Sequence, residues 1–260
     1  MDKISTLLVP FDFSPLAEKA LDYAVDFIGL KTNMKLVLVH ITETPESDNI
    51  NTRFEEIKLK YSKTLRSPME CIHKAGSLTD SVLEVQKNQQ IDLIIMATSA
   101  PSDSSITKSN TSELVKVADC PVLVVPNTSD DFQLKNIALV LGKDEINNKE
   151  ALSTLLDVAR KFNAKVHVLT IENEPGIYGY SSTDEKNENL LEYYLESFYK
   201  DHMFIENKDV VEGISQYVTE KEIDLITILP SNHDKKNSPS KGKLTEALTL
   251  QSKVPLLAIN

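Results

Sequence analysis

The chain is poor in cysteine: its 260 residues include only Cys71 and Cys120. Small domains that are held together by disulfides carry many more cysteines for their length, so a disulfide framework is excluded. Cys71 lies inside an apolar segment predicted to be a strand, and Cys120 lies just before another. We therefore expect two buried, reduced thiols rather than a bridge.

Long hydrophobic runs are also lacking. No segment approaches the roughly 20 consecutive apolar residues that a membrane-spanning helix needs. The apolar stretch within MDKISTLLVPFDF at the N-terminus is too short for the core of a signal peptide, and Asp12 interrupts it. We expect a protein without membrane segments that works in the cytoplasm.

Positive charge is in deficit, with 28 lysines and arginines against 39 acidic residues and a net charge of −11. Nonspecific binding to nucleic acid or to an anionic membrane depends on basic surface, so both are poor functional candidates. A small anion held by backbone N–H groups is compatible with this charge. The sequence also has no Walker loop, no metal-ligand spacing and no nucleophile paired with a base, so nothing in it argues for an enzyme.

Short apolar runs alternate with segments of helical periodicity. Residues 91–96 and 121–126 are continuous apolar runs, typical of strands buried on both faces of a parallel sheet. This alternation predicts an α/β fold with a doubly wound parallel sheet. In the first half it predicts strands at 4–9, 35–41, 68–74, 91–96 and 121–126, with helices at 15–28, 51–66, 78–85 and 111–117.

The pattern begins again after a polar linker at 127–131. KLVLVHI in the first half is matched by KVHVLTI in the second, and IDLIIMA is matched by IDLITIL. Four pairs of landmarks lie 132, 130, 132 and 134 residues apart: Asp12 and Asp144, Lys35 and Lys165, Ile91 and Ile223, and Pro121 and Pro255. A constant offset over several elements indicates internal duplication. We predict two tandem five-stranded domains, residues 1–128 and 132–260.

One helix of the second half is predicted to be rich in aromatic residues. The periodicity favours a helix over 184–200, followed by a weak strand at 202–206. Tyr193, Tyr194, Phe198 and Tyr199 would crowd that helix. We interpret them as a stripe packed in a core or a domain interface rather than as a ligand site.

The first half resembles the universal stress protein family through four segments in order: LLVPFDFSPLAEKALDYA, KLVLVHI, GSLTDSVLEVQKNQQIDLIIMA and SNTSELVKVADCPVLVVP. The second half resembles it more weakly, through IALVLGKD, KVHVLTI, IDLITIL and LTEALTLQSKVPLLAI. The resemblance implies an adenine-nucleotide-hydrolase-like fold in a tandem member of the family. It also implies pairing of the two domains within the chain, through residues 122–125 and 256–259 of their last strands, and it leaves a homodimer open.

The glycines of the family's phosphate-binding loop are missing. Relatives that bind ATP have the motif Gly-x-x-Gly after the fourth strand, followed further on by Gly-Ser or Gly-Thr. Here those three positions hold Ala97, Ala100 and Lys108. Glycine lets backbone N–H groups approach phosphate oxygens, and a side chain narrows that approach. In the second half, the loop at 230–241 has no glycine before Gly242, so we predict a degraded phosphate site in the first domain and essentially none in the second.

Other ligand positions of the family map onto residues that are present. The resemblance assigns the adenine and ribose side to Asp12 and backbone contacts with adenine to Val39. The remaining candidates lie around the start of the helix after the loop, where an anion is favoured: Lys108, Ser109, Asn110 and Thr111. Each assignment has a structural alternative, because Asp12 suits a turn and the residues at 109–111 suit a helix cap.

Two hypotheses follow. The first is a noncatalytic stress-response or signalling protein of the universal stress type, which acts through protein contacts and requires no cofactor. The alternative is a module that binds ATP or another adenine nucleotide in the cleft of the first domain only, with or without slow ATPase activity.

Overall fold

The computed structural model describes residues 4–30, 32–43, 49–98, 110–129, 131–142, 144–146, 149–172, 180–230 and 243–259. The chain divides into two compact units, Met1–Phe132 and Gln133–Asn260. None of the described helices combines the length and the hydrophobicity needed to cross a lipid bilayer.

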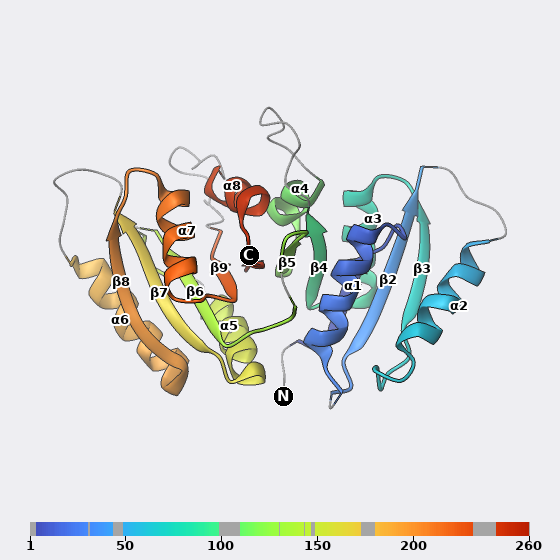
Figure 1. The fold of residues 1–260 in the computed structure, drawn as a ribbon, viewed down its shortest axis with the longest axis horizontal. Helices are drawn as coiled ribbons and strands as arrows, with labels where there is room; N and C mark the ends of the chain where they lie inside the picture. Colours follow the sequence, from blue (N-terminus) through green and yellow to red (C-terminus); the bar gives the residue numbers. More distant parts are fainter. Residues whose placement is uncertain are drawn as a thin grey trace. The chain divides into compact units, whose positions relative to one another are not determined.

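The described residues of the first unit form five parallel strands and four helices. They are β1 (Thr6–Pro10), α1 (Pro15–Ile28), β2 (Lys35–Thr42), α2 (Ile50–Tyr61), β3 (Glu70–Ala75), α3 (Leu78–Gln89), β4 (Leu93–Thr98), α4 (Asn110–Val117) and β5 (Val122–Pro126). The strands lie in the order β3-β2-β1-β4-β5 (Figure 1). Because the chain reverses its direction across the sheet after β3, right-handed crossovers put α1 and α2 on one face and α3 and α4 on the other.

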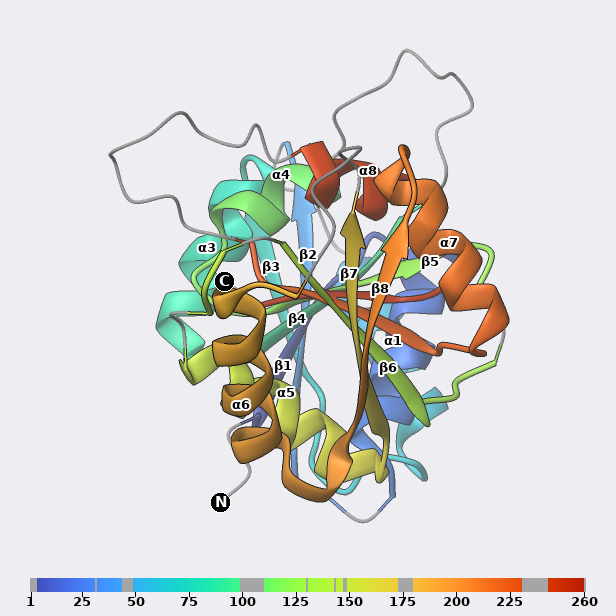
Figure 2. The ribbon, with the colours of Figure 1, turned by 90° about the vertical axis from the view of Figure 1, so that its left-hand side faces the viewer.

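The second unit repeats this topology. Its elements are β6 (Asn136–Leu141), α5 (Lys149–Phe162), β7 (Lys165–Glu172), α6 (Ser182–Leu195), the 3₁₀ helix η1 (Glu196–Phe198), β8 (Tyr199–Glu206), α7 (Val210–Glu220), β9 (Leu225–Ile228), α8 (Lys243–Gln251) and β10 (Leu256–Ala258). The strands are again parallel, in the order β8-β7-β6-β9-β10. Figure 2 shows α6 and α7 on opposite sides of β7 and β8. The predicted fold class, two doubly wound domains related by duplication, is confirmed.

Local signals explain where the first helix begins and ends. The Ser14 hydroxyl accepts a hydrogen bond from the Ala17 N–H group at 3.2 Å, and Pro15 occupies the first helical position. At the other end, Gly29 has φ +69° and donates its N–H group to the Val25 carbonyl at 2.9 Å. These are the contacts that satisfy helix ends, so the boundaries predicted for this helix are confirmed.

An aspartate before the fourth strand fixes the start of the first strand in each unit. Asp92 Oδ2 accepts hydrogen bonds from the backbone N–H groups of Ser5 at 2.8 Å and Thr6 at 2.9 Å. In the second unit, Asp224 Oδ2 accepts those of residues 135–136 at 2.7 and 2.9 Å. The duplication therefore preserves side-chain contacts as well as the order of elements.

The prediction of one aromatic helix over 184–200 is wrong. Helix α6 ends at Leu195, because Glu196 takes φ +51° and leaves the helical conformation. Tyr199 is already extended and pairs with Val166 of β7, which lengthens the predicted weak strand to eight residues. Tyr193 has 77% of its surface exposed, so these aromatic residues form no common buried stripe.

Candidate functional site

In the first unit, the strand order reverses between β1 and β4, and ligands of open α/β sheets bind at such a point, outside the carboxyl ends of the strands. A cavity of about 120 Å³ lies there. Its walls come from the end of β1, the start of α1, strand β2, the start of α3 and the end of β4. Three predicted site residues line it together: Asp12, Val39 and Ala97.

Asp12 is held in a tight turn at the mouth of this cavity. Its Oδ1 atom accepts a hydrogen bond from the Ser14 N–H group at 2.9 Å. The next residue, Phe13, has φ +61°, which is uncommon for an aromatic residue. The Phe13 ring packs edge-on against Phe11, with centroids 4.9 Å apart, and the Arg53 guanidinium lies 3.8 Å from its centroid. These contacts stabilise the strained turn, which keeps the Asp12 carboxylate beside the cavity.

Two residues of β2, Val39 and Ile41, line the cavity. The Val39 carbonyl accepts a hydrogen bond from the Phe11 N–H group at 2.8 Å, so it completes the ladder between β1 and β2. That register ends at Pro10 and Val39. Because strand backbone groups alternate in direction, Ile41 turns its N–H and C=O groups the same way as Val39, past the end of β1. Ile41 lines the cavity, and counting two residues on from the last paired position could have identified it.

His40 is a structural residue, as its position in an apolar strand predicts. It is 6% exposed, and its Nδ1 atom lies 2.8 Å from the Phe11 carbonyl oxygen. A carbonyl oxygen only accepts, so Nδ1 carries the proton and donates. His40 therefore braces the turn behind the cavity.

The phosphate side of the candidate site is described only in part. Helix α4 begins at Asn110, which is exposed, and Thr111 is buried behind it. The Thr111 hydroxyl donates to the Ala97 carbonyl at a long 3.5 Å. Lys108 and Ser109, like Ala100, lie outside the described residues.

The cavity is small and largely apolar. Leu16, Ile41, Met96 and the methyl group of Ala97 contribute to its walls. Small-molecule sites usually enclose about 300–1,000 Å³. At about 120 Å³, this cavity can take a group the size of a single ring.

In the second unit, residues 144–146 correspond to the Asp12 turn, and side chains of α6 bind them. The Asn187 side chain, 1% exposed, accepts from the Ile146 N–H group at 2.9 Å and donates to the Asp144 carbonyl at 3.1 Å. Lys186 forms an ion pair with Glu145 at 3.1 Å. These three residues therefore make polar contacts within their own unit.

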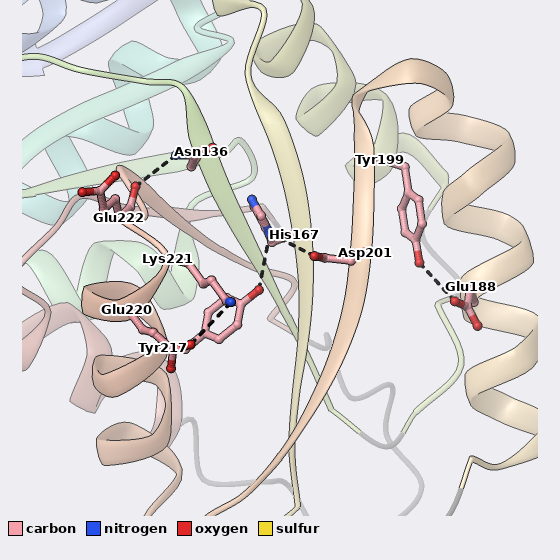
Figure 3. A network of polar contacts seen from close by, with 9 residues as sticks. All are labelled: Asn136, His167, Glu188, Tyr199, Asp201, Tyr217, Glu220, Lys221 and Glu222. Atoms are coloured by element: carbon pink, nitrogen blue, oxygen red, sulfur yellow. Dashed lines mark hydrogen bonds and ion pairs between the residues drawn. The ribbon is translucent and has the colours of Figure 1, made fainter.

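A polar network lies at the other end of the second sheet (Figure 3). His167 Nδ1 is 2.9 Å from Asp201 Oδ1, and the Tyr217 hydroxyl lies 3.4 Å from the same nitrogen. Burial raises the pKa of Tyr217 to about 12, and the charges of Asp201 and Glu220 add to this. His167 and Asp201 are near the amino ends of β7 and β8, away from the carboxyl-end crevice, so the network joins β7, β8 and α7 structurally.

Neither thiol is a candidate nucleophile. Both cysteines are free, as predicted, although Cys71 is only half-buried. Burial raises the pKa of Cys71 to about 11 and that of Cys120 to about 12, so both are protonated at neutral pH. Within the described ranges, no group of three or more histidine, cysteine or acidic side chains is arranged to hold a metal ion.

The strands and helices of the first unit define a doubly wound α/β domain with a cavity at its switch point. The model of the universal stress protein family matches residues 3–126, which is nearly the whole first unit. The first unit is therefore similar in sequence to proteins of the universal stress protein family. No curated protein sequence matches the chain.

Solved structures share the fold over the full length. A universal stress protein from Archaeoglobus fulgidus DSM 4304 aligns with 99% of this chain and 97% of its own, at a TM-score of 0.69 and 16% identity. A protein of unknown function from Pseudomonas aeruginosa PAO1 aligns with 98% of this chain and 92% of its own, at a TM-score of 0.66 and 15% identity. The cytoplasmic domain of a prokaryotic cation chloride cotransporter aligns with 98% of this chain and 95% of its own, at 0.59 and 11% identity. At these identities the likeness shows the fold alone.

Proposed function

We propose that this chain is a stress-response or signalling protein of the universal stress type that acts in the cytoplasm through contacts with other proteins and catalyses no reaction. The observation that carries the proposal is the cavity at the switch point of the first unit, which has a volume of about 120 Å³ and Ala97 in its wall. Relatives that hold a triphosphate place glycine at that position, where backbone N–H groups must come close to phosphate oxygens.

The chemistry of the described residues supports a noncatalytic role. Asp12 Oδ1 is engaged by the Ser14 N–H group, and His40 Nδ1 donates to a backbone carbonyl. The two thiols are protonated at neutral pH because burial raises the pKa of each. The groups nearest to the cavity thus maintain the turn and are not arranged as a nucleophile with its base.

Restoring the glycines tests the proposal. We expect the melting temperature of the wild-type chain to be unchanged by ATP and magnesium. The triple variant Ala97→Gly, Ala100→Gly and Lys108→Gly should gain a rise in melting temperature with ATP, because a ligand that binds only the folded state stabilises it. The matched control adds Asp12→Ala to the triple variant and should lose that gain. A rise of several degrees in the wild-type chain would contradict the proposal.

A second candidate function is adenine-nucleotide binding by the first unit alone. The specific observation in its favour is that Asp12 and Ile41 line one cavity at the switch point. Mass spectrometry of the gently purified chain tests it, with Asp12→Ala as the control. A copurified adenine nucleotide that disappears in the variant would support this function, and the absence of any bound nucleotide would remove it.

A further inference from the structure

The segments around the second helix of the two units carry opposite net charges: the one in the first unit is basic and the one in the second unit is acidic. Helices α2 and α6 occupy the same place in the duplicated topology, since each follows the second strand of its unit. In an acidic chain, the segment of α2 and the turn after it is basic. Five cations stand there against Glu55 and Glu56: Arg53, Lys58, Lys60, Lys63 and Arg66.

The segment of α6 and η1 is acidic. It contains Lys186 and five carboxylates: Asp184, Glu185, Glu188, Glu192 and Glu196. The two segments therefore have complementary charge, although the duplication gave them a common place in the fold.

Some of these charged side chains form ion pairs inside their own unit, and others, among the described residues, do not. Lys58 pairs with Glu55 at 2.8 Å, and Lys60 pairs with Glu18 at 3.4 Å. Lys63 and Arg66 are exposed and form no ion pair within the part of the chain that the structure describes.

On α6 and η1, too, some charged side chains are paired and others, among the described residues, are not. Lys186 forms an ion pair with Glu145 at 3.1 Å, and Glu196 forms one with Arg160 at 3.5 Å. Glu185 and Glu192 are exposed and, among the described residues, have no ion-pair partner.

Each segment also has an exposed large apolar side chain close in the sequence to these charges. Leu59 is 76% exposed near the end of α2, and Lys63 and Arg66 follow in the turn after this helix, which ends at Tyr61. Tyr193 is 77% exposed and adjoins Glu192, which lies at i+7 from Glu185 on the same side of the helix. An apolar contact flanked by opposite charges is the pattern of a protein interface, in which aromatic residues provide contact and charge sets orientation.

We propose that the α6 face of one chain, Glu185, Glu192 and Tyr193, binds the α2 face of a second copy of this chain. This α2 face consists of Leu59 near the end of the helix and of Lys63 and Arg66 in the turn after it. The contact joins two different surfaces, so it is heterologous and each chain offers both halves of it. Two single-helix faces bury less area than a standard interface, which makes the association weak and dependent on salt. This self-association does not depend on whether the first unit binds a nucleotide.

Charge exchange in the full-length chain tests the proposal by sedimentation velocity. The wild-type chain should form dimers and larger species as its concentration rises from micromolar to near millimolar. It should lose them in about 1 M NaCl, where the screening length falls to about 3 Å. The acidic variant, Lys63→Glu with Arg66→Glu, should associate at least about tenfold more weakly than wild type, because like charges then face each other.

The basic variant, Glu185→Lys with Glu192→Lys, should be weakened to the same degree. An equimolar mixture of the two variants should associate again, because the acidic α2 face of one then meets the basic α6 face of the other. Circular dichroism and melting temperature confirm that both variants are folded, and Leu59→Ser provides an independent loss of the apolar contact. A wild-type chain that stays monomeric at all concentrations would overturn the proposal. So would association that neither variant changes, or a mixture in which association does not return.

Discussion

Individual carboxylates stabilise this fold by accepting hydrogen bonds from the backbone, and their positions in the sequence only partly predict these contacts. Asp92 and Asp224 each accept hydrogen bonds from the backbone at the start of a neighbouring strand that lies far away in the sequence. Asp12 holds a turn, which is one of the two roles that the sequence left open, and it also lines the cavity. The residue type and the spacing predicted a polar contact, but its partner depends on the pairing of strands.

Removing the Asp92 carboxylate should destabilise the first unit. Asp92→Ala leaves the N–H groups of Ser5 and Thr6 without their acceptor, which we expect to cost about 1–3 kcal/mol in the free energy of unfolding. Asp224→Ala should act similarly in the second unit. Urea denaturation measures both, with Asp92→Asn as a milder variant that retains an acceptor oxygen and Glu56→Ala as the surface control. Equal stability of Asp92→Ala and wild type would show that the contact contributes nothing.

Asp26 should make the stability depend on pH. Partial burial raises its pKa, and the neighbouring charges of Asp22 and Asp131 raise it further. A carboxyl whose pKa is raised on folding contributes stability while it is protonated at low pH, and this contribution is lost as the pH rises through the folded-state pKa. At neutral pH the charged Asp26 is therefore unfavourable.

Asp26→Asn should accordingly raise the melting temperature at pH 7. The gain should shrink as the pH falls towards 3.8, the ordinary value for an aspartate, because wild-type Asp26 is then protonated as well. Differential scanning calorimetry across this range measures it, with Asp119→Asn as the control. A gain that is the same at every pH would refute the electrostatic explanation.

At the scale of elements, the sequence predicts best where the signal is local. Ser14, Pro15 and Gly29 bracket α1 as expected, and Ser77 caps α3 by accepting from the Asp80 N–H group at 3.2 Å. The end of α6 was missed because Glu196 carries no sequence signal for a positive φ. The pairing of Tyr199 with β7, which is a tertiary contact, decides that this segment becomes a strand.

The end of α3 offers a direct test of helix termination. Gln90 closes this helix at φ +52° and ψ +54°, a left-handed conformation that is costly for a residue with a side chain. We expect Gln90→Gly to increase the free energy of unfolding by about 0.5–1 kcal/mol. The matched control, Asn88→Gly within the helix, should lower it, since glycine is a poor helix former. Chemical denaturation that shows Gln90→Gly to be no more stable than wild type would contradict this explanation.

At the scale of the whole molecule, the duplication could be predicted from the sequence because the same apolar patterns recur in the same order along the chain. The candidate site could be predicted only in part. Asp12, Val39 and Ala97 do meet at one cavity, but the contribution of Ile41 depends on where the register of β1 ends. The opposite charges of α2 and α6 were present in the sequence, but which of them face solvent unpaired is a property of the packed units.

The central claim is that the crevice of the first unit is too restricted to hold a nucleoside triphosphate. Isothermal titration calorimetry of the full-length chain with ATP and magnesium tests it most directly. The account predicts no saturable heat of binding up to millimolar ATP. A saturable isotherm with one site per chain and a micromolar or tighter dissociation constant, abolished by Asp12→Ala, would contradict it.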